Sequence, residues 1–242
     1  LAMAVGVLLL EHRGADPPSH PLEMHQVTAF TDFATQPAVS ADGRLVAFIR
    51  GPNSFTTPGQ IYVKVLPAGE PVQLTRDATL KMAPAFSPDA TRIAYTVMTP
   101  SSISWDTWVV PVLGGEARPW LPNASGLRWT APQRLLFSEI KDGGIHMALV
   151  AATESRTESR DVYIPESIRG MAHQSRLSPD ERSVIVVEMD NGGLGPCRLV
   201  PFDGSSPGKI LGPEKGQCTH AVWAPDGRTM YFTSTASGSS QI

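Results

Sequence analysis

The sequence of 242 residues lacks basic runs, metal-binding spacings and nucleotide-binding loops. It has no run of five or more Lys or Arg residues and a formal net charge of −3, so no electrostatic feature favours nucleic acid binding. None of its six histidines shows the H-E-x-x-H spacing of a zinc site. Asp190-Asn191-Gly192 matches only a fragment of a calcium loop and is interpreted as a turn. We therefore expect no metal, no cofactor and no nucleic acid partner for this region.

An apolar segment too short to cross a bilayer opens the chain. Leu1 to Leu10 is uniformly apolar, which is about half of the roughly 20 residues that a membrane-spanning helix needs. We interpret 1–10 as the distal part of a transmembrane helix and 11–26 as a linker that leads out of the membrane. A signal-peptide core is the main alternative, although no basic segment or Ala-x-Ala site is visible. A buried strand or helix of a soluble protein is a further alternative.

Gly and Pro, by contrast, are plentiful. With 21 Gly, 22 Pro and 41% hydrophobic residues, the chain is rich in turns but too apolar to be disordered. A Ser-Pro-Asp-Gly-like turn recurs between apolar strands, and its copies begin at Ser40, Ser87, Thr130, Ser178 and Ala224. Their third positions hold Asp42, Asp89, Pro132, Asp180 and Asp226. These positions are 43 to 48 residues apart, the length of one four-stranded propeller blade.

Each residue type in these turns has a physical role. Pro presets φ at the first central position of a type I turn, and Asp accepts hydrogen bonds from the amides that follow. Gly43 and Gly227 can take the left-handed conformation that closes a bulged hairpin. Ala90 and Glu181 replace Gly in two copies, so these turns either carry about 1 kcal/mol of left-handed strain or adopt another geometry. The turn residues Asp42, Asp89, Asp180 and Asp226 are therefore expected to be structural.

The outer half of each blade repeats as well. The segment Gln60 to Leu74 corresponds to Thr107 to Trp120, with a strand, a Gly-containing turn and a short last strand in each. The sequence thus predicts an all-β propeller of four-stranded antiparallel blades over 27–242, with about five blades present. In the degenerate third copy, we expect Trp129 to take the core position that Val39, Phe86, Leu177 and Trp223 hold in their own blades.

On these turns the sequence resembles the TolB-like, WD-repeat-like β-propellers of bacteria, over about residues 27 to 242. The resemblance implies a ring of typically six blades. Gln241-Ile242 takes the place of Gln60-Ile61 at the start of a third strand, so the fifth blade is expected to be truncated and the full ring to have six or more blades. The terminal blades should then expose apolar faces.

A second resemblance concerns the order of apolar helix, linker and propeller. Together with the stretches Arg169 to His173, Glu188 to Gly193 and Pro196 to Gly204, this order is similar to the C-terminal regions of membrane-anchored bacterial serine/threonine protein kinases. In those proteins a cytoplasmic kinase precedes the membrane helix and the propeller lies outside, and winged-helix regulators with anchored propellers share the layout. The resemblance implies a membrane-anchored, extracytoplasmic (periplasmic) propeller. The chain itself has no kinase signature.

One motif resembles a catalytic element. Gly204-Ser205-Ser206-Pro207-Gly208 fits the G-x-S-x-G pattern of a hydrolase nucleophile elbow, but an elbow needs a strand, a turn and a helix. Here the motif joins two outer strands of a blade. We interpret it as a hairpin and expect no catalytic residue in this chain.

Binding residues are expected where the innermost strands begin, because propellers line their central channel there. The candidates lie six or seven positions ahead of the third residue of the recurring turn in their blade, and they are Gln36, Met82, His173, Gln174 and His220. The alternative is that they are ordinary strand-end residues. If they bind, a protein or a small ligand would meet this face, with a pH dependence at about pH 6 to 7 from imidazole protonation.

The two cysteines leave two alternatives open. Cys197 opens a third strand and Cys218 precedes the first strand of the next blade. Outside the cytoplasm a disulfide would be permitted and would contribute about 3 kcal/mol. The first and third strands of a sheet are about 10 Å apart, however, which opposes the bond unless the offset between blades compensates.

Three functions fit these observations. The first is a non-catalytic sensing or protein-interaction propeller that is tethered outside the membrane to a cytoplasmic kinase or winged-helix domain. The second is a TolB-like periplasmic module that binds envelope partners. The third is the gating propeller of a prolyl oligopeptidase-type serine peptidase, which requires an α/β-hydrolase domain after the last blade.

Overall fold

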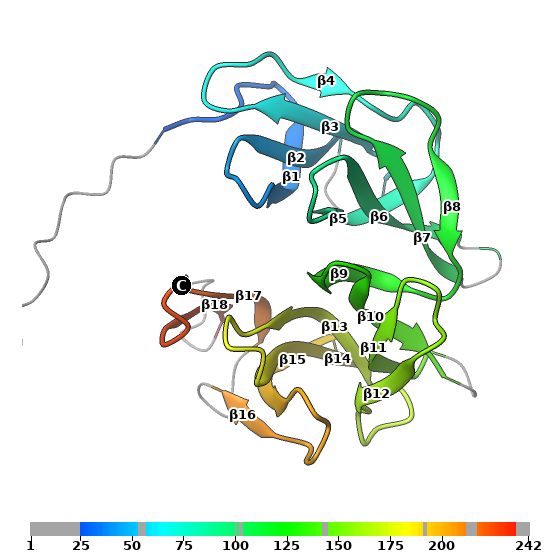
Figure 1. Cartoon of the computed structure of the whole chain (residues 1–242), viewed down its shortest axis with the longest axis vertical. Helices are drawn as coiled ribbons and strands as arrows, with labels where there is room; N and C mark the ends of the chain where they lie inside the picture. The colour runs from blue at the N-terminus through cyan, green and yellow to red at the C-terminus, as the bar shows by residue number, and fades with distance from the viewer. Residues whose placement is uncertain are drawn as a thin grey trace, which may run out of the picture.

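In the computed structural model, β-sheets are arranged as blades of an open ring around a common axis (Figure 1). The structure describes residues 25–52, 57–99, 101, 104–141, 145–190, 193–211 and 217–235. These residues form strands and turns without any helix, so none of them supplies a helix able to span a membrane. The segment expected to enter the membrane, 1–10, lies outside the described residues, as do all but the last two residues of the linker 11–26.

Four blades have four strands each in the described residues, and a fifth has two. Blades 1 and 2 contain β1 (Phe33–Val39), β2 (Leu45–Gly51), β3 (Gln60–Val65), β4 (Val72–Gln73), β5 (Leu80–Phe86), β6 (Arg92–Thr99), β7 (Ser104–Pro111) and β8 (Arg118–Leu121). Blade 3 contains β9 (Ser125–Ala131), β10 (Arg134–Ile140), β11 (Met147–Thr153) and β12 (Ser159–Tyr163). Blades 4 and 5 contain β13 (Met171–Leu177), β14 (Ser183–Asp190), β15 (Gly193–Pro201), β16 (Lys209–Leu211), β17 (Cys218–Trp223) and β18 (Met230–Ser234).

Within each blade, consecutive strands pair antiparallel, and the first strand lies nearest the axis (Figure 1). The all-β propeller expected from the turn spacing is confirmed. Blades 3 and 4 are also joined by one parallel pairing, between Met147 of β11 and Met171 of β13. The ring is open between blade 1 and blade 5 (Figure 1).

The recurring turns share one hydrogen-bond arrangement. In blade 2 the Ser87 hydroxyl donates to Asp89 Oδ1 at 2.6 Å and accepts from the Arg92 amide at 3.0 Å, while the Thr91 amide donates to Asp89 Oδ1 at 3.1 Å. Equivalent bonds occur in the turns of Asp42 and Asp180. Ala90 adopts the left-handed conformation, with a φ of 54°, which Gly would adopt more readily.

The hydrogen bonds to Asp89 make the stability of this hairpin depend on pH. The Ser87 hydroxyl and then the Thr91 amide lower the pKa of Asp89 to about 2. A carboxylate whose pKa falls on folding stabilises the protein above its unfolded pKa of about 3.9, and this stabilisation is lost as the pH falls through the folded pKa. The stability advantage of the wild type over Asp89→Asn should therefore shrink between about pH 4 and pH 2 in urea titrations. A constant difference over that range would contradict the arrangement.

The core consists of apolar layers between neighbouring blades. Ile61 and Tyr95 belong to the layer between blades 1 and 2, and Phe137 belongs to the layer between blades 2 and 3. Leu149 and Ile185 belong to the two layers that follow. Because every layer takes residues from two sheets, the blades stabilise one another in sequence around the ring.

Trp129 has the register expected for the degenerate third blade. It pairs with Leu135 as Phe86 pairs with Ile93, and it packs against the layer between blades 2 and 3. The register of the blade therefore survives the loss of Ser, Asp and Gly from its turn. Val39 has the same offset in blade 1 but is 58% exposed, so the expected core position is wrong for that residue.

The two end blades differ in how their outer faces are covered. The segment before β1 crosses blade 1, where the Phe30 ring lies 5.8 Å from that of Phe48 and 6.3 Å from that of Tyr62. The side chain of Phe48 is consequently only 3% exposed. On blade 5, Val222 and Tyr231 remain 46% and 54% exposed. The expected apolar exposure thus holds for blade 5 and in part for blade 1, where Phe30 covers Phe48 but four other apolar residues stay 55% to 59% exposed, namely Phe33, Val39, Val65 and Val72.

Candidate binding site

The innermost strands share a bulge at the same position. Gln36, Ala83, Gly126 and Gln174 have φ angles of 52°, 53°, 62° and 43°, and the pairing of each innermost strand shifts its register there. A bulge bends the strand and redirects the side chains on both sides of it. The bulges therefore decide which side chains reach the axis of the ring.

The five residues expected to bind lie on four innermost strands, as their spacing predicted. Gln36 of β1 accepts a hydrogen bond from the Ala83 amide of β5 at 2.6 Å, so its side chain links blades 1 and 2. Met82 and Gln174 are half-buried, whereas His220 is exposed. Within the described residues, no hydrogen bond or ring contact joins Gln36, Met82, His173 or Gln174 to another member of the set.

His173 is the member with an unusual environment. Its ring centroid lies 5.4 Å from that of Trp105, which comes from β7 of blade 2. Its Nε2 is sealed from solvent without a partner among the described residues. Burial lowers the pKa of His173 to about 4, so the imidazole is neutral at neutral pH. A pH dependence of binding at about pH 6 to 7 is therefore not expected from this histidine, which corrects the sequence-based expectation.

Two arginines that the sequence analysis did not single out also lie on innermost strands. Arg128 of β9 donates through Nη1 to the carbonyl oxygens of Ala83 and Pro84 at 3.2 and 2.8 Å. Arg176 of β13 donates to the Ser175 carbonyl at 3.1 Å. Both are half-buried, and neither forms an ion pair with a carboxylate in the described residues. The signal in the sequence is positional, because each arginine precedes the third turn residue of its blade by four positions.

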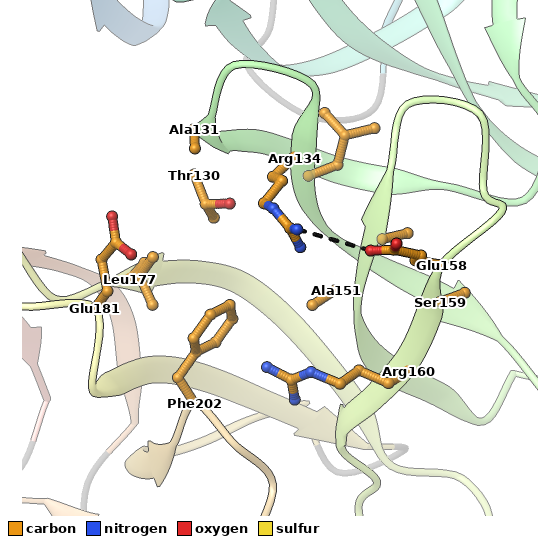
Figure 2. Close-up of a pocket in the computed structure, with 12 residues that line it drawn as sticks. Thr130, Ala131, Arg134, Ala151, Glu158, Ser159, Arg160, Leu177, Glu181 and Phe202 are labelled. Carbon is orange, nitrogen blue, oxygen red and sulfur yellow. Dashed lines mark ion pairs between the residues drawn. The ribbon is translucent and has the colours of Figure 1, made fainter.

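A pocket of about 310 Å³ lies between blades 3 and 4 (Figure 2). Its apolar part includes Ala151, Leu177 and Phe202, and Arg134 and Arg160 reach in from its edge. Arg134 forms an ion pair with Glu158 at 3.7 Å, and the Arg160 guanidinium lies 4.8 Å from the centre of the Phe202 ring. The pocket is therefore apolar inside and charged at its rim, the usual composition of a small-molecule site.

A small residue explains why this pocket occurs beside blade 3. Strand pairing places Ala151 opposite Leu136, and the corresponding partners of the second strand in the other complete blades are Val63, Val109 and Leu199. Ala is smaller than Val or Leu, so space is left between the sheets. This comparison between blades could have been made from the sequence once the register of each blade was known.

The cysteines are brought together by neighbouring blades. Cys197 of β15 and Cys218 of β17 have their Cα atoms 5.4 Å apart, and the structure joins them in a disulfide. The offset between blades 4 and 5 supplies the proximity that two strands of one blade would not have.

Chemistry-bearing groups are otherwise dispersed. Ser206 is exposed in the turn between β15 and β16, so the G-x-S-x-G motif has no helix behind it. Among the described residues, no group of three or more His, Cys, Asp or Glu side chains could hold a metal ion.

Comparisons with known proteins identify the fold. A putative TolB from Agrobacterium tumefaciens is 18% identical, with a TM-score of 0.66 over 86% of this chain and 72% of that one. TolB from Acinetobacter baumannii is also 18% identical, with a TM-score of 0.67 over 86% of this chain and 50% of its own. A chain of the nidogen/laminin complex is 14% identical, with a TM-score of 0.61 over 83% of this chain and 71% of that one.

No protein-family model matches the sequence, and no curated protein sequence matches it. The structural neighbours therefore define the class of fold, a TolB-like β-propeller. At sequence identities below one fifth, a shared fold does not show a shared activity. The chain spans half the length of one of these TolB proteins.

Proposed function

We propose that this chain is a non-catalytic binding propeller that acts outside the cytoplasm and receives a protein or small-ligand partner near the axis of its ring. The observation that carries this proposal is the uneven distribution of polar groups. Arg128 and Arg176 lie on innermost strands with N–H groups that no described residue uses, whereas Ser206 lies in an outer turn.

The fold and the cysteines support the proposal. The similarity to TolB proteins and to a chain of the nidogen/laminin complex is consistent with a propeller that binds other proteins. The short distance between Cys197 and Cys218 suits an oxidising compartment such as the periplasm. Membrane anchoring through 1–10 and coupling to an upstream kinase rest on the sequence resemblance alone.

The whole chain is expected to show no esterase or peptidase turnover above background. Hydrolysis of an activated ester and of a peptide amide would be measured for the wild type and for Ser206→Ala. The physical reason is that the exposed Ser206 hydroxyl has neither the helix nor the orienting base of a nucleophile elbow. Turnover that disappears in Ser206→Ala would overturn the non-catalytic assignment.

Binding is tested separately with the immobilised chain and a bacterial envelope extract. Replacement of both His173 and His220 by Ala should weaken capture of the proteins that the wild type retains. His25→Ala is the matched control, because His25 lies in the segment before β1. Equal capture by the double variant and the wild type would show that the partner does not bind at this end of the innermost strands.

A further inference from the structure

The innermost strands carry positive charge without any acidic residue. β1, β5, β9, β13 and β17 contain no Asp or Glu. Their ionisable residues are Lys81, Arg128, His173, Arg176 and His220. Lys81 is neutralised by Asp77 at 2.7 Å, and His173 is uncharged at neutral pH because burial lowers its pKa. The uncompensated charge near the axis therefore comes mainly from Arg128 and Arg176.

These two arginines occupy equivalent positions on neighbouring blades. Strand pairing places Arg128 opposite Leu136 and Arg176 opposite Ile185. The equivalent residues of blades 1 and 2 are the small Ala38 and Ala85. Two long cationic side chains thus stand on neighbouring blades at a position where blades 1 and 2 carry short apolar side chains.

Neither guanidinium is saturated by the protein. Arg128 uses Nη1 for its bonds to the carbonyl oxygens of Leu127, Ala83 and Pro84, and Arg176 uses Nη1 for Ser175. Their remaining N–H groups have no partner among the described residues, and none of them is sealed from solvent. The carbonyl bonds fix the position of Arg128 and leave donors of both groups available.

The energetic cost of this arrangement points to a missing counter-charge. Burial lowers the pKa of Arg128, and the positive charge of Arg176 lowers it further. Arginine nevertheless stays protonated in proteins, so two like charges share a half-buried region. Two guanidinium groups with free N–H donors match the geometry and charge of a carboxylate or a phosphate.

We propose that Arg128 and Arg176 form a binding site for a small oxyanion near the axis of the propeller, the shared chemistry being a carboxylate or phosphoryl group. The site refines the proposed function, on which it rests, by naming the ligand class. The ligand's oxygen atoms would accept from the free N–H groups of both arginines, and its negative charge would remove their mutual repulsion.

Isothermal titration calorimetry on the whole chain tests the site with inorganic phosphate and with citrate as probes. NaCl keeps the ionic strength constant, so that general screening does not imitate binding. The wild type should bind at least one probe saturably, and Arg176→Gln should bind it at least about tenfold more weakly, as the loss of a charge-assisted bond implies. Phosphate binding alone assigns a phosphoryl ligand, and citrate binding alone assigns a carboxylate ligand.

Arg44→Gln is the matched control, because the Arg44 side chain is 82% exposed in the turn between β1 and β2. The affinity of this variant should equal that of the wild type. Arg176→Lys keeps the charge but loses the planar fork, and it should bind with intermediate affinity. Absence of saturable binding to either probe, or equal affinity in Arg176→Gln and the wild type, would overturn the site.

Thermal melting without added oxyanion separates a ligand site from a merely structural arginine. Arg176→Gln should melt at or above the wild-type temperature, since the variant relieves repulsion, and should lose the rise in melting temperature that phosphate or citrate gives the wild type. A variant that melts well below the wild type would show a structural role instead. If the oxyanion measurements fail while His173 and His220 still govern protein capture, the ligand class is wrong but the binding function stands.

Discussion

Replacement of Trp129 by alanine is expected to lower the free energy of unfolding by about 3 kcal/mol, the lower end of the range for Trp in a core because this side chain is half-buried. The indole stacks on Trp120 with ring centroids 5.5 Å apart and donates from Nε1 to Glu154 at 2.8 Å. Truncation removes apolar contact between blades 2 and 3 and takes this donor from the Glu154 carboxylate, whose ion pair to Arg92 is then its one remaining partner among the described residues.

Urea titration of the whole chain measures this loss. Leu113→Ala is the control, because Leu113 is fully exposed and its truncation should change stability by less than about 0.5 kcal/mol. A loss below about 1 kcal/mol for Trp129→Ala would mean that the third blade does not have the register described above.

Replacement of both cysteines by alanine is expected to cost about 3 kcal/mol under oxidising conditions. The bond between Cys197 and Cys218 closes a loop with a sequence separation of 21, and such a loop limits the entropy of the unfolded chain. Reduction of the wild type with dithiothreitol should produce a loss of similar size, whereas the double variant should not respond to the reductant. Two titratable thiols in the unfolded, unreduced protein would show that the bond does not form.

The architecture could be predicted from the sequence because its signal is repeated and local. Each hairpin depends on Ser, Asp and a left-handed residue within a few positions, as the bonds of Ser87 and Asp89 show. Copies at similar spacing then define the blade. Even the degenerate copy could be placed, since Trp129 keeps its offset from the turn.

The axial site could be predicted only in part, because bulges carry no clear signature when the left-handed residue is not Gly. Gln36, Ala83 and Gln174 take positive φ, although residues with a Cβ atom favour negative φ. The positions of Gln36 and His173 on innermost strands followed from spacing. The cationic pair Arg128 and Arg176 did not, since an isolated Arg in a strand is usually a surface charge.

The contacts of individual side chains could not be predicted from the sequence either. His173 meets Trp105 from a blade that is not its neighbour along the chain, and only the arrangement of the blades around a common axis brings them together. Similarly, the cysteines approach one another through the offset between blades 4 and 5. The cover that Phe30 provides for Phe48 depends on the path of a segment without regular structure.

The backbone pairing between Met147 and Met171 adds a hydrogen-bonded contact to the side-chain packing between blades 3 and 4. A rotation of one of these sheets against the other must therefore break a backbone contact as well as shift packed side chains. Arg128 and Arg176 stand on the innermost strands on either side of this boundary. A shift of blade 4 against blade 3 would thus change the axial site only after this contact has opened.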